Sequence, residues 1–104
     1  MNNVEYQSGE LVFEWDSEKA RINKLKHKIS FETAANIFFD ENRIESLDEE
    51  HSANEDRWQV IGMVDDVLFV VYTERGEIIR LISARKATKK ERSIYYGDGD
   101  LYFA

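Results

Sequence analysis

The second half of the chain carries the clearest alternation of apolar and polar positions. Three runs are rich in β-branched and aromatic residues and have the length of strands: residues 57–64, 67–74 and 78–85. Asp65-Asp66 and Arg75-Gly76 separate these runs, and both pairs suit the tight turns of hairpins. The pattern therefore predicts an antiparallel meander of three strands.

Two-residue turns at these places would also set the register of the meander. In that register Val60, Val71 and Arg80 lie side by side across the three strands, on one face of the sheet. A guanidinium among valines needs an anionic partner, an open edge or a functional reason. The other face takes the alternate positions, which include Arg57, Gln59, Ile61, Val70, Tyr72, Leu81, Ser83 and Arg85. Both faces are apolar near the middle and need covering, by helices or by a partner.

The first half of the chain predicts one strand followed by two helices. Residues 11–15 have the composition of a short strand, and Asp16 or Ser17 suits the N-cap of a helix. Spaced apolar positions continue that helix, and Ser30 begins a second one with the same periodicity. A further short strand is expected over residues 43–47.

The remaining segments complete the predicted fold. Residues 48–56 are strongly acidic and are expected to form a solvated loop, and Thr88 and Glu91 form a capping box that begins a helix over residues 87–96. The fold class is α+β, with an antiparallel sheet of about four strands, two N-terminal helices and one C-terminal helix. We expect a flexible segment over residues 1–10, a single domain over 11–96 and a tail over 97–104.

Composition favours an ordinary globular protein with one unusual feature. The chain has 104 residues, 42% of them hydrophobic and 34% charged, no cysteine, and a net charge of −7. No apolar run is long enough to span a membrane and no secretion signal is evident, so a cytoplasmic location is expected. The acidic balance argues against broad nucleic-acid binding. However, seven of the fourteen Lys and Arg residues lie between Arg75 and Arg92, which predicts a local basic groove.

The candidate chemistry is carried by Arg, Lys, His, Glu and Tyr, because the chain lacks phosphate-loop, redox and metalloprotease motifs. The two histidines, His27 and His51, lie far apart in sequence and make a weak case for a metal site, because the acidic loop around His51 is more simply a solvated turn. Each candidate also has an ordinary structural interpretation: Arg57 could pair with Glu74, Tyr72 could be a core residue, and the Lys-rich first helix could simply face solvent. The cluster formed by Arg80, Arg85, Lys86, Lys89 and Lys90 around one strand end is less easily explained in this way.

Several short sequence blocks along residues 13–96 form a distinctive series. The most specific block is Ile82-Ser83-Ala84-Arg85-Lys86-Ala87-Thr88 with Glu91-Arg92 after it. The others are Phe13-Glu14-Trp15-Asp16, Lys26-His27, Ser30-Phe31-Glu32, His51-Ser52, Glu55-Asp56-Arg57-Trp58, Ile61-Gly62 and Tyr72-Thr73-Glu74-Arg75-Gly76. In composition and order these blocks resemble the BrnT toxin family. The chain departs from the family at Lys28, where members usually have a glycine suited to a left-handed helix C-cap.

The resemblance implies a RelE-like fold and a metal-independent, cofactor-free endoribonuclease that acts as the toxin of a type II toxin–antitoxin pair. In that scheme the RNA 2′-hydroxyl attacks the neighbouring phosphate, which requires a base, an acid and cations. Arg80 and Arg85 are the candidates for charge stabilisation, with Arg57 assisting. Glu55 or His51 is the candidate base and His51 or Tyr72 the candidate acid, while Lys86, Lys89 and Lys90 would bind RNA.

The same resemblance implies a protein partner, a BrnA-like ribbon-helix-helix antitoxin, through which the complex would bind operator DNA. The chain alone could form a homodimer through an uncovered apolar surface or through the tail Leu101-Tyr102-Phe103. The alternative function is a non-catalytic module that binds RNA or protein through the same basic strand end. Convergence of Arg80, Arg85 and an acid–base group would distinguish the two.

Overall fold

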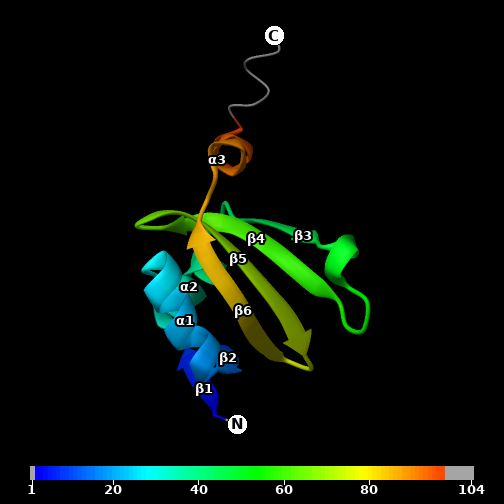
Figure 1. Ribbon diagram of the computed structural model, residues 1–104. Coiled ribbons are helices and arrows are strands. Elements are labelled where there is room, and N and C mark those ends of the chain that lie inside the picture. Colours follow the sequence, from blue (N-terminus) through cyan, green and yellow to red (C-terminus); the bar gives the residue numbers. More distant parts are fainter. Residues whose placement is uncertain (1, 98–104) are drawn as a thin grey trace.

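A six-stranded sheet organises the computed structural model, which describes residues 2–97 (Figure 1). The strands are β1 (Asn3–Ser8), β2 (Leu11–Asp16), β3 (Ile44–Leu47), β4 (Arg57–Val64), β5 (Asp66–Arg75) and β6 (Ile78–Lys86). The helices are α1 (Ser17–His27), α2 (Phe31–Ala35) and α3 (Lys89–Tyr96), with short 3-10 helices η1 (Asn36–Phe39) and η2 (Glu49–His51). The strand order across the sheet is β1-β2-β6-β5-β4-β3.

The α+β class is confirmed, but the predicted sheet of about four antiparallel strands is wrong in two respects. The described residues form six strands, and the pair β2–β6 is parallel, with Glu14 opposite Arg80. All other neighbouring strands run antiparallel. The parallel pair thus places β2, from the first part of the chain, beside β6, from its second half.

The extra strand comes from the N-terminal segment that the sequence predicts to be flexible. β1 pairs with β2 along its whole length, from Asn3 opposite Asp16 to Ser8 opposite Leu11. The Tyr6 ring lies against Trp15, with 5.6 Å between the ring centroids. β1 has few apolar side chains, so its hydrophobic pattern gives little indication of a strand. The clearer indication of a hairpin is Gly9 in the turn, whose φ of +59° suits glycine in a tight hairpin.

The predicted register of the meander is wrong, by one residue between β4 and β5 and by two residues between β5 and β6, where Glu74 faces Ile79. Val64 pairs with Asp66, with only Asp65 between them at a φ of +64°, so Arg57 faces Thr73 and not Glu74. A one-residue slip exchanges the two faces of a strand relative to its neighbour. On the other side of β5, the turn residues are Gly76 and Glu77, and a bulge follows where the register shifts between Val71 and Tyr72.

The hydrophobic core fills one face of the sheet, beneath α2 and η1. Val60, Val70 and Ala84 lie in one row across β4, β5 and β6, and all three are buried. They pack with residues of α2 and η1, among them Phe31 and Phe38. The alternate rows of the sheet face away from this core, and we call that side the open face. It carries Glu14, Arg57, Gln59, Phe69, Val71, Thr73, Arg75, Arg80, Ser83 and Arg85.

α1 lies along the edge that β6 leaves free beyond Arg80 (Figure 1). The buried side chain of Asn23 replaces a neighbouring strand there. Its amide nitrogen donates to the carbonyl of Ala84 at 2.9 Å and to that of Ile29 at 3.1 Å, and its oxygen accepts from the Ala84 N–H at 3.0 Å. These bonds close a sheet edge whose backbone groups would otherwise be unpaired.

Lys28 ends α1 in the left-handed conformation, with φ 63° and ψ 23°, although it is not glycine. Replacing Lys28 by glycine should therefore raise the free energy of unfolding by about 1 kcal/mol, because the strain of the side chain at positive φ is removed. Urea unfolding measures the change. The matched control is Lys26→Gly, in the right-handed last turn of the same helix, which should destabilise by a similar amount. Equal effects of the two substitutions would contradict the strain argument.

α3 differs from the predicted arrangement, because it stands beyond the end of β6 and does not cover the sheet (Figure 1). Its predicted capping box is confirmed, with Thr88 and Glu91 bonded reciprocally, and Gly97 ends it at a φ of 73°. No residue of α3 is buried. The second predicted helix also differs, because it is a short α-helix continued by the 3-10 helix η1. The expected aromatic tail lies outside the described residues, and the predicted domain limits of residues 11–96 stay a prediction.

Candidate functional site

One row of side chains crosses four strands of the open face at the end remote from α3. Arg57 of β4 lies opposite Thr73 of β5, which lies opposite Arg80 of β6, which in turn lies opposite Glu14 of β2. Strands are about 4.8 Å apart, so the Cα atoms of Arg57 and Arg80 are separated by roughly 10 Å. The corrected register thus brings together two arginines that the predicted register placed on opposite faces.

Arg80 has the anionic partner that its position requires. Its guanidinium donates to Glu14 at 2.8 Å and to the side-chain oxygen of Asn3 at 2.7 Å. Glu14 is only 9% exposed and also lies 3.8 Å from Arg75, which reaches Glu55 at 3.4 Å. The charge of Arg80 is therefore largely balanced within the protein.

Arg57 is different from the other six arginines. Each of those forms an ion pair with a carboxylate: Arg21, Arg43, Arg75, Arg80, Arg85 and Arg92. The guanidinium of Arg57 has no hydrogen-bond or ion-pair partner within residues 2–97. A half-buried cation without a carboxylate is available to an external anion.

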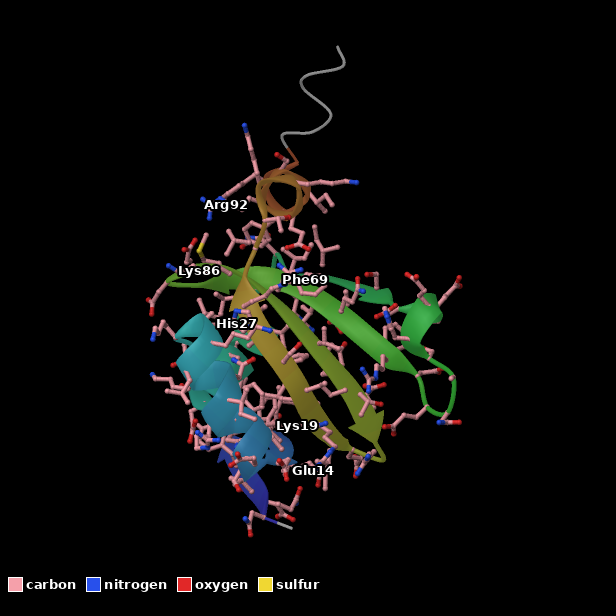
Figure 2. All side chains as sticks on the ribbon, in the orientation of Figure 1. Glu14, Lys19, His27, Phe69, Lys86 and Arg92 are labelled. Carbon is pink, nitrogen blue, oxygen red and sulfur yellow. The ribbon has the colours of Figure 1, made fainter. Side chains whose placement is uncertain are left out.

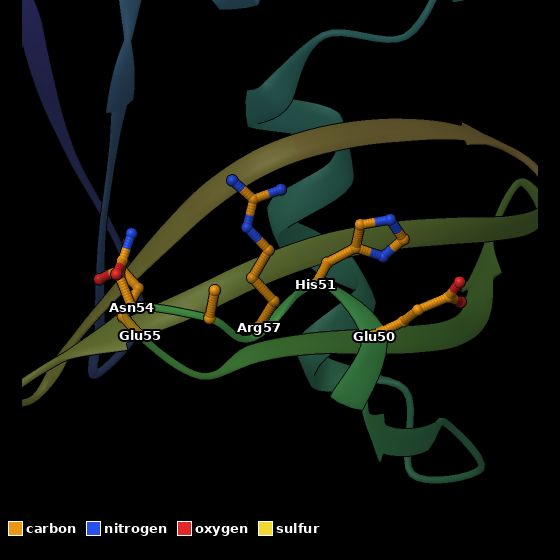
Figure 3. Close-up of a pocket in the computed structure, with 6 residues that line it drawn as sticks. Glu50, His51, Asn54, Glu55 and Arg57 are labelled. Carbon is orange, nitrogen blue, oxygen red and sulfur yellow. The ribbon is translucent and has the colours of Figure 1, made fainter.

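A pocket of about 410 Å³ surrounds Arg57 and is formed by the loop between β3 and β4. Its lining residues are Glu50, His51, Ala53, Asn54, Glu55 and Arg57. Figure 3 shows the Arg57 guanidinium and the His51 ring extending to the same side, whereas the Glu50 carboxylate points away from them. The pocket thus combines a free guanidinium, an imidazole and the carboxylate of Glu55.

His51 is oriented by Asp48, the residue that precedes η2. Its Nδ1 lies 3.0 Å and 3.2 Å from the two carboxylate oxygens of Asp48, and its side chain is 63% exposed. Burial raises the pKa of Asp48, but hydrogen bonds from His51 and Gln59 outweigh it and lower this pKa below the ordinary value. With Nδ1 held by the carboxylate, Nε2 is left free to form a hydrogen bond with a ligand.

The remaining predicted cations lie at the other end of β6. Arg85 forms two hydrogen bonds with Glu91, at 2.8 and 2.9 Å, and its guanidinium lies 4.2 Å from the centre of the Phe69 ring. Lys86 lies 4.0 Å from Asp66, and Lys89 and Lys90 are exposed on α3. Figure 2 shows Lys86 and Arg92 at the end of the molecule opposite Glu14. The structure therefore divides the predicted cluster and separates Arg85 from Arg80.

Tyr72 lies on the core face, away from Arg57, His51 and Arg80. It is 3% exposed, and its hydroxyl donates a hydrogen bond to Glu45. Burial and this hydrogen bond raise the pKa of Tyr72 well above its ordinary value. The structure thus favours the core interpretation of Tyr72 over the role of a catalytic acid.

Glu14, Arg75 and Asp48 belong to this region but were not among the sequence candidates. Glu14 and Arg75 occur in two of the blocks that carry the family resemblance, Phe13-Glu14-Trp15-Asp16 and Tyr72-Thr73-Glu74-Arg75-Gly76. Their proximity depends on the parallel pairing of β2 with β6, for which the local sequence pattern has no signal. Asp48 could have been proposed from its spacing, three residues before His51.

The C-terminal helix is attached to this domain by polar contacts from three carboxylates. Tyr95 donates to Asp40 at 2.6 Å, Arg92 donates to Asp66 at 2.7 Å, and Glu91 accepts from Arg85. The hydrogen bond with Asp40, followed by burial, raises the pKa of Tyr95 to about 12. Since no residue of α3 is buried, these bonds are the main attachment of the helix.

We expect α3 to detach in acid before the sheet unfolds. The pKa of Glu91 is lowered by Arg85, that of Asp66 by the Val67 N–H and Arg92, and that of Asp40 by hydrogen bonds that outweigh its burial. Groups with lowered folded-state pKa values stabilise fully above their unfolded values, near 4, and lose this contribution as the pH falls below about 4. Hydrogen exchange of the α3 amides against those of β5 measures the difference. Simultaneous loss of protection in both elements would contradict this expectation.

No group of three or more His, Cys, Asp or Glu side chains in residues 2–97 is arranged to hold a metal ion. No helix in the same part of the chain has the length and apolar character needed to cross a membrane.

Comparison with known proteins identifies the family. Residues 15–91 match the family model described as the ribonuclease toxin, BrnT, of type II toxin–antitoxin systems. The crystal structure of the Brucella abortus ribonuclease toxin, BrnT, is similar in fold, with a TM-score of 0.55 and 23% sequence identity over 72% of this chain and 94% of that chain. No curated protein matches significantly. Since the family model covers most of the sequence, including His51, Arg57 and Arg80, the chain belongs to the BrnT family of ribonuclease toxins.

Proposed function

We propose that this protein is an active endoribonuclease that cleaves RNA without a metal ion and thereby inhibits translation and growth. The RNA 2′-hydroxyl attacks the adjacent phosphate, the 5′-oxygen of the next nucleotide leaves, and a 2′,3′-cyclic phosphate remains. This reaction requires proton transfer at two oxygens and stabilisation of the charge on the phosphorane. It takes place in the cytoplasm, where RNA is translated.

The observation that carries this proposal is the unpaired guanidinium of Arg57 beside His51. A cation that no internal carboxylate neutralises can bind a phosphate without first breaking an ion pair. Arg57 is the only arginine of this kind in residues 2–97, and it lines the same pocket as His51 and Glu55. We therefore assign stabilisation of the phosphorane primarily to Arg57, with Arg80 at the next cation position of the same row.

The acid and the base are assigned to His51 and Glu55 of the pocket, because the carboxylate of Glu50 points away from Arg57. Glu55 serves as the base for the 2′-hydroxyl, and His51 donates a proton from Nε2 to the leaving oxygen. Asp48 supports the second role, since its carboxylate bonds Nδ1, orients the ring and leaves Nε2 free to meet the leaving oxygen. Tyr72 has no part in this assignment, because its hydroxyl is bonded to Glu45 on the other face.

The partner that we propose is a BrnA-like antitoxin with a ribbon-helix-helix domain. A toxin with a net charge of −7 is poorly suited to neutralise DNA phosphates, so the complex would bind its operator through the antitoxin. Size measurements with and without the protein encoded beside the toxin test this association. They also test whether the toxin alone forms a homodimer.

Purified protein should cleave single-stranded RNA equally well with and without EDTA, and the products should end in 2′,3′-cyclic phosphate. The expectation follows from a mechanism in which arginine, histidine and glutamate supply all the charges and protons. The control is a substrate with 2′-fluoro groups, which has no attacking hydroxyl and should remain intact. Loss of cleavage in EDTA that magnesium or manganese restores would refute the metal-independent mechanism.

A further inference from the structure

A second pocket, of about 210 Å³, lies between α1 and β6. Its lining residues are Lys19, Ile22, Asn23, Lys26, His27, Ile82 and Ser83. Figure 2 shows Lys19 and His27 along α1, beside β6. We call this pocket the α1–β6 groove.

The groove collects positive charge that the protein does not neutralise. Lys19 and Lys26 are seven residues apart, which puts both on one side of an α-helix. Neither has a carboxylate within 4.0 Å among residues 2–97, and no acidic residue lines the groove. A pocket with ammonium, imidazole and hydroxyl groups and no carboxylate attracts an anion.

The groove is continuous with the open face that carries Arg57. Ser83 lines the groove and lies in the row Gln59–Val71–Ser83, directly across β5 from the strand that holds Arg57. The bulge opposite Val71 and Tyr72 makes Ile82 the extra residue of β6, and Ile82 also lines the groove. From Ser83 to Arg57 the path crosses two strand spacings and two residues, roughly 12 Å between Cα atoms.

We propose that the α1–β6 groove binds the phosphates of single-stranded RNA on one side of the cleavage point, with the strand crossing the open face to Arg57. The inference rests on the proposed function, because it takes the Arg57 pocket as the position of the scissile phosphate. Lys19 and Lys26 contact phosphates, and Ile22 and Ile82 provide apolar contact for a base or ribose. The Lys-rich helix that the sequence favours as a solvated surface thus becomes part of the substrate site.

Binding and cleavage can be tested separately with a single-stranded RNA that carries 2′-fluoro groups and cannot be cleaved. The test variant is Lys19→Gln/Lys26→Gln. The matched control is Lys24→Gln/Lys28→Asn, which removes the same charge from the opposite side of α1 and keeps a residue that tolerates the left-handed C-cap. Fluorescence anisotropy at several salt concentrations gives the dissociation constant and its salt dependence for each protein.

We expect the test variant to bind the RNA about 10-fold more weakly than the wild type. The slope of the logarithm of the association constant against the logarithm of the salt concentration should become shallower by about 1.4, the value for two phosphate contacts on a single strand. The control variant should keep the wild-type slope. Equal losses of RNA affinity in both variants, or no loss in either, would contradict the proposal that the groove binds RNA. So would intact RNA binding combined with loss of antitoxin binding, because the groove would then serve a protein.

The outcomes also separate this inference from the proposed function. If the 2′-fluoro RNA binds with the expected slopes but the wild type does not cleave ordinary RNA, RNA binding in the groove is supported and the catalytic proposal is contradicted. If the wild type cleaves RNA and the test variant has an unchanged salt slope and kcat/KM, the catalytic proposal is supported and RNA binding in the groove is contradicted.

Discussion

Replacing Arg57 by alanine should reduce the rate constant for RNA cleavage by about 10²- to 10³-fold while leaving the unfolding midpoint unchanged. The activity falls because the phosphorane loses a cation that no other arginine can supply without breaking an ion pair. The stability is maintained because Arg57 has no ion pair within residues 2–97. Single-turnover cleavage of a short RNA and thermal unfolding measure the two quantities.

Arg57→Lys and Arg21→Ala make this experiment specific. Lysine keeps the charge at position 57 but cannot bond a phosphate through two parallel N–H groups, so it should recover only part of the rate. Arg21 is an exposed arginine of α1 paired with Glu18, and its loss should leave cleavage unchanged. A folded Arg57→Ala protein with the wild-type rate would remove Arg57 from the mechanism.

Replacing Arg80 by alanine, unlike replacing Arg57, should lower the free energy of unfolding by about 3 kcal/mol. The substitution leaves Glu14 buried without the partner at 2.8 Å, and Arg75 at 3.8 Å is too distant to replace it fully. Urea unfolding at neutral pH measures the loss. A growth assay alone would therefore mislead, because a loss of toxicity in Arg80→Ala would follow from unfolding of the protein as readily as from removal of a catalytic cation.

The double variant Glu14→Gln/Arg80→Met separates the two effects. It removes both charges and keeps side chains of similar size, so it should recover much of the stability lost in Arg80→Ala. If it folds well and is still inactive, Arg80 contributes to catalysis as well as to the ion pair. If Arg80→Ala is as stable as the wild type, the ion pair between Arg80 and Glu14 does not contribute to the stability of the fold.

The sequence predicts most elements of this fold, because short-range patterns determine them. The N-caps at Asp16 and Ser30 and the capping box of α3 depend on residues three positions apart, and all are observed. The register of the meander depends instead on turn geometry. Asp65 alone at positive φ, where the sequence indicated a two-residue turn, was enough to move Arg57 from Glu74 to Thr73.

The sequence predicted the types of residue in the candidate site, but it did not predict which of them lie close together in the fold. His51, Glu55 and Arg57 are close in sequence, so their shared pocket could be expected. Arg80 and Arg85 are also close in sequence, but a strand of nine residues holds them at opposite ends. The partner of Arg80 is Glu14, which lies 66 positions earlier and has no local signal.

The parallel pairing of β2 with β6 has a consequence for the order in which the protein folds during synthesis. The β1–β2 hairpin is complete once residue 16 has been made, but its other neighbour in the sheet begins only at Ile78. Contacts so distant in sequence form late, because the loop between them must first be closed. At least the first 80 residues must therefore be translated before Glu14 can meet Arg80, and a chain released before β6 cannot assemble the row that crosses the open face.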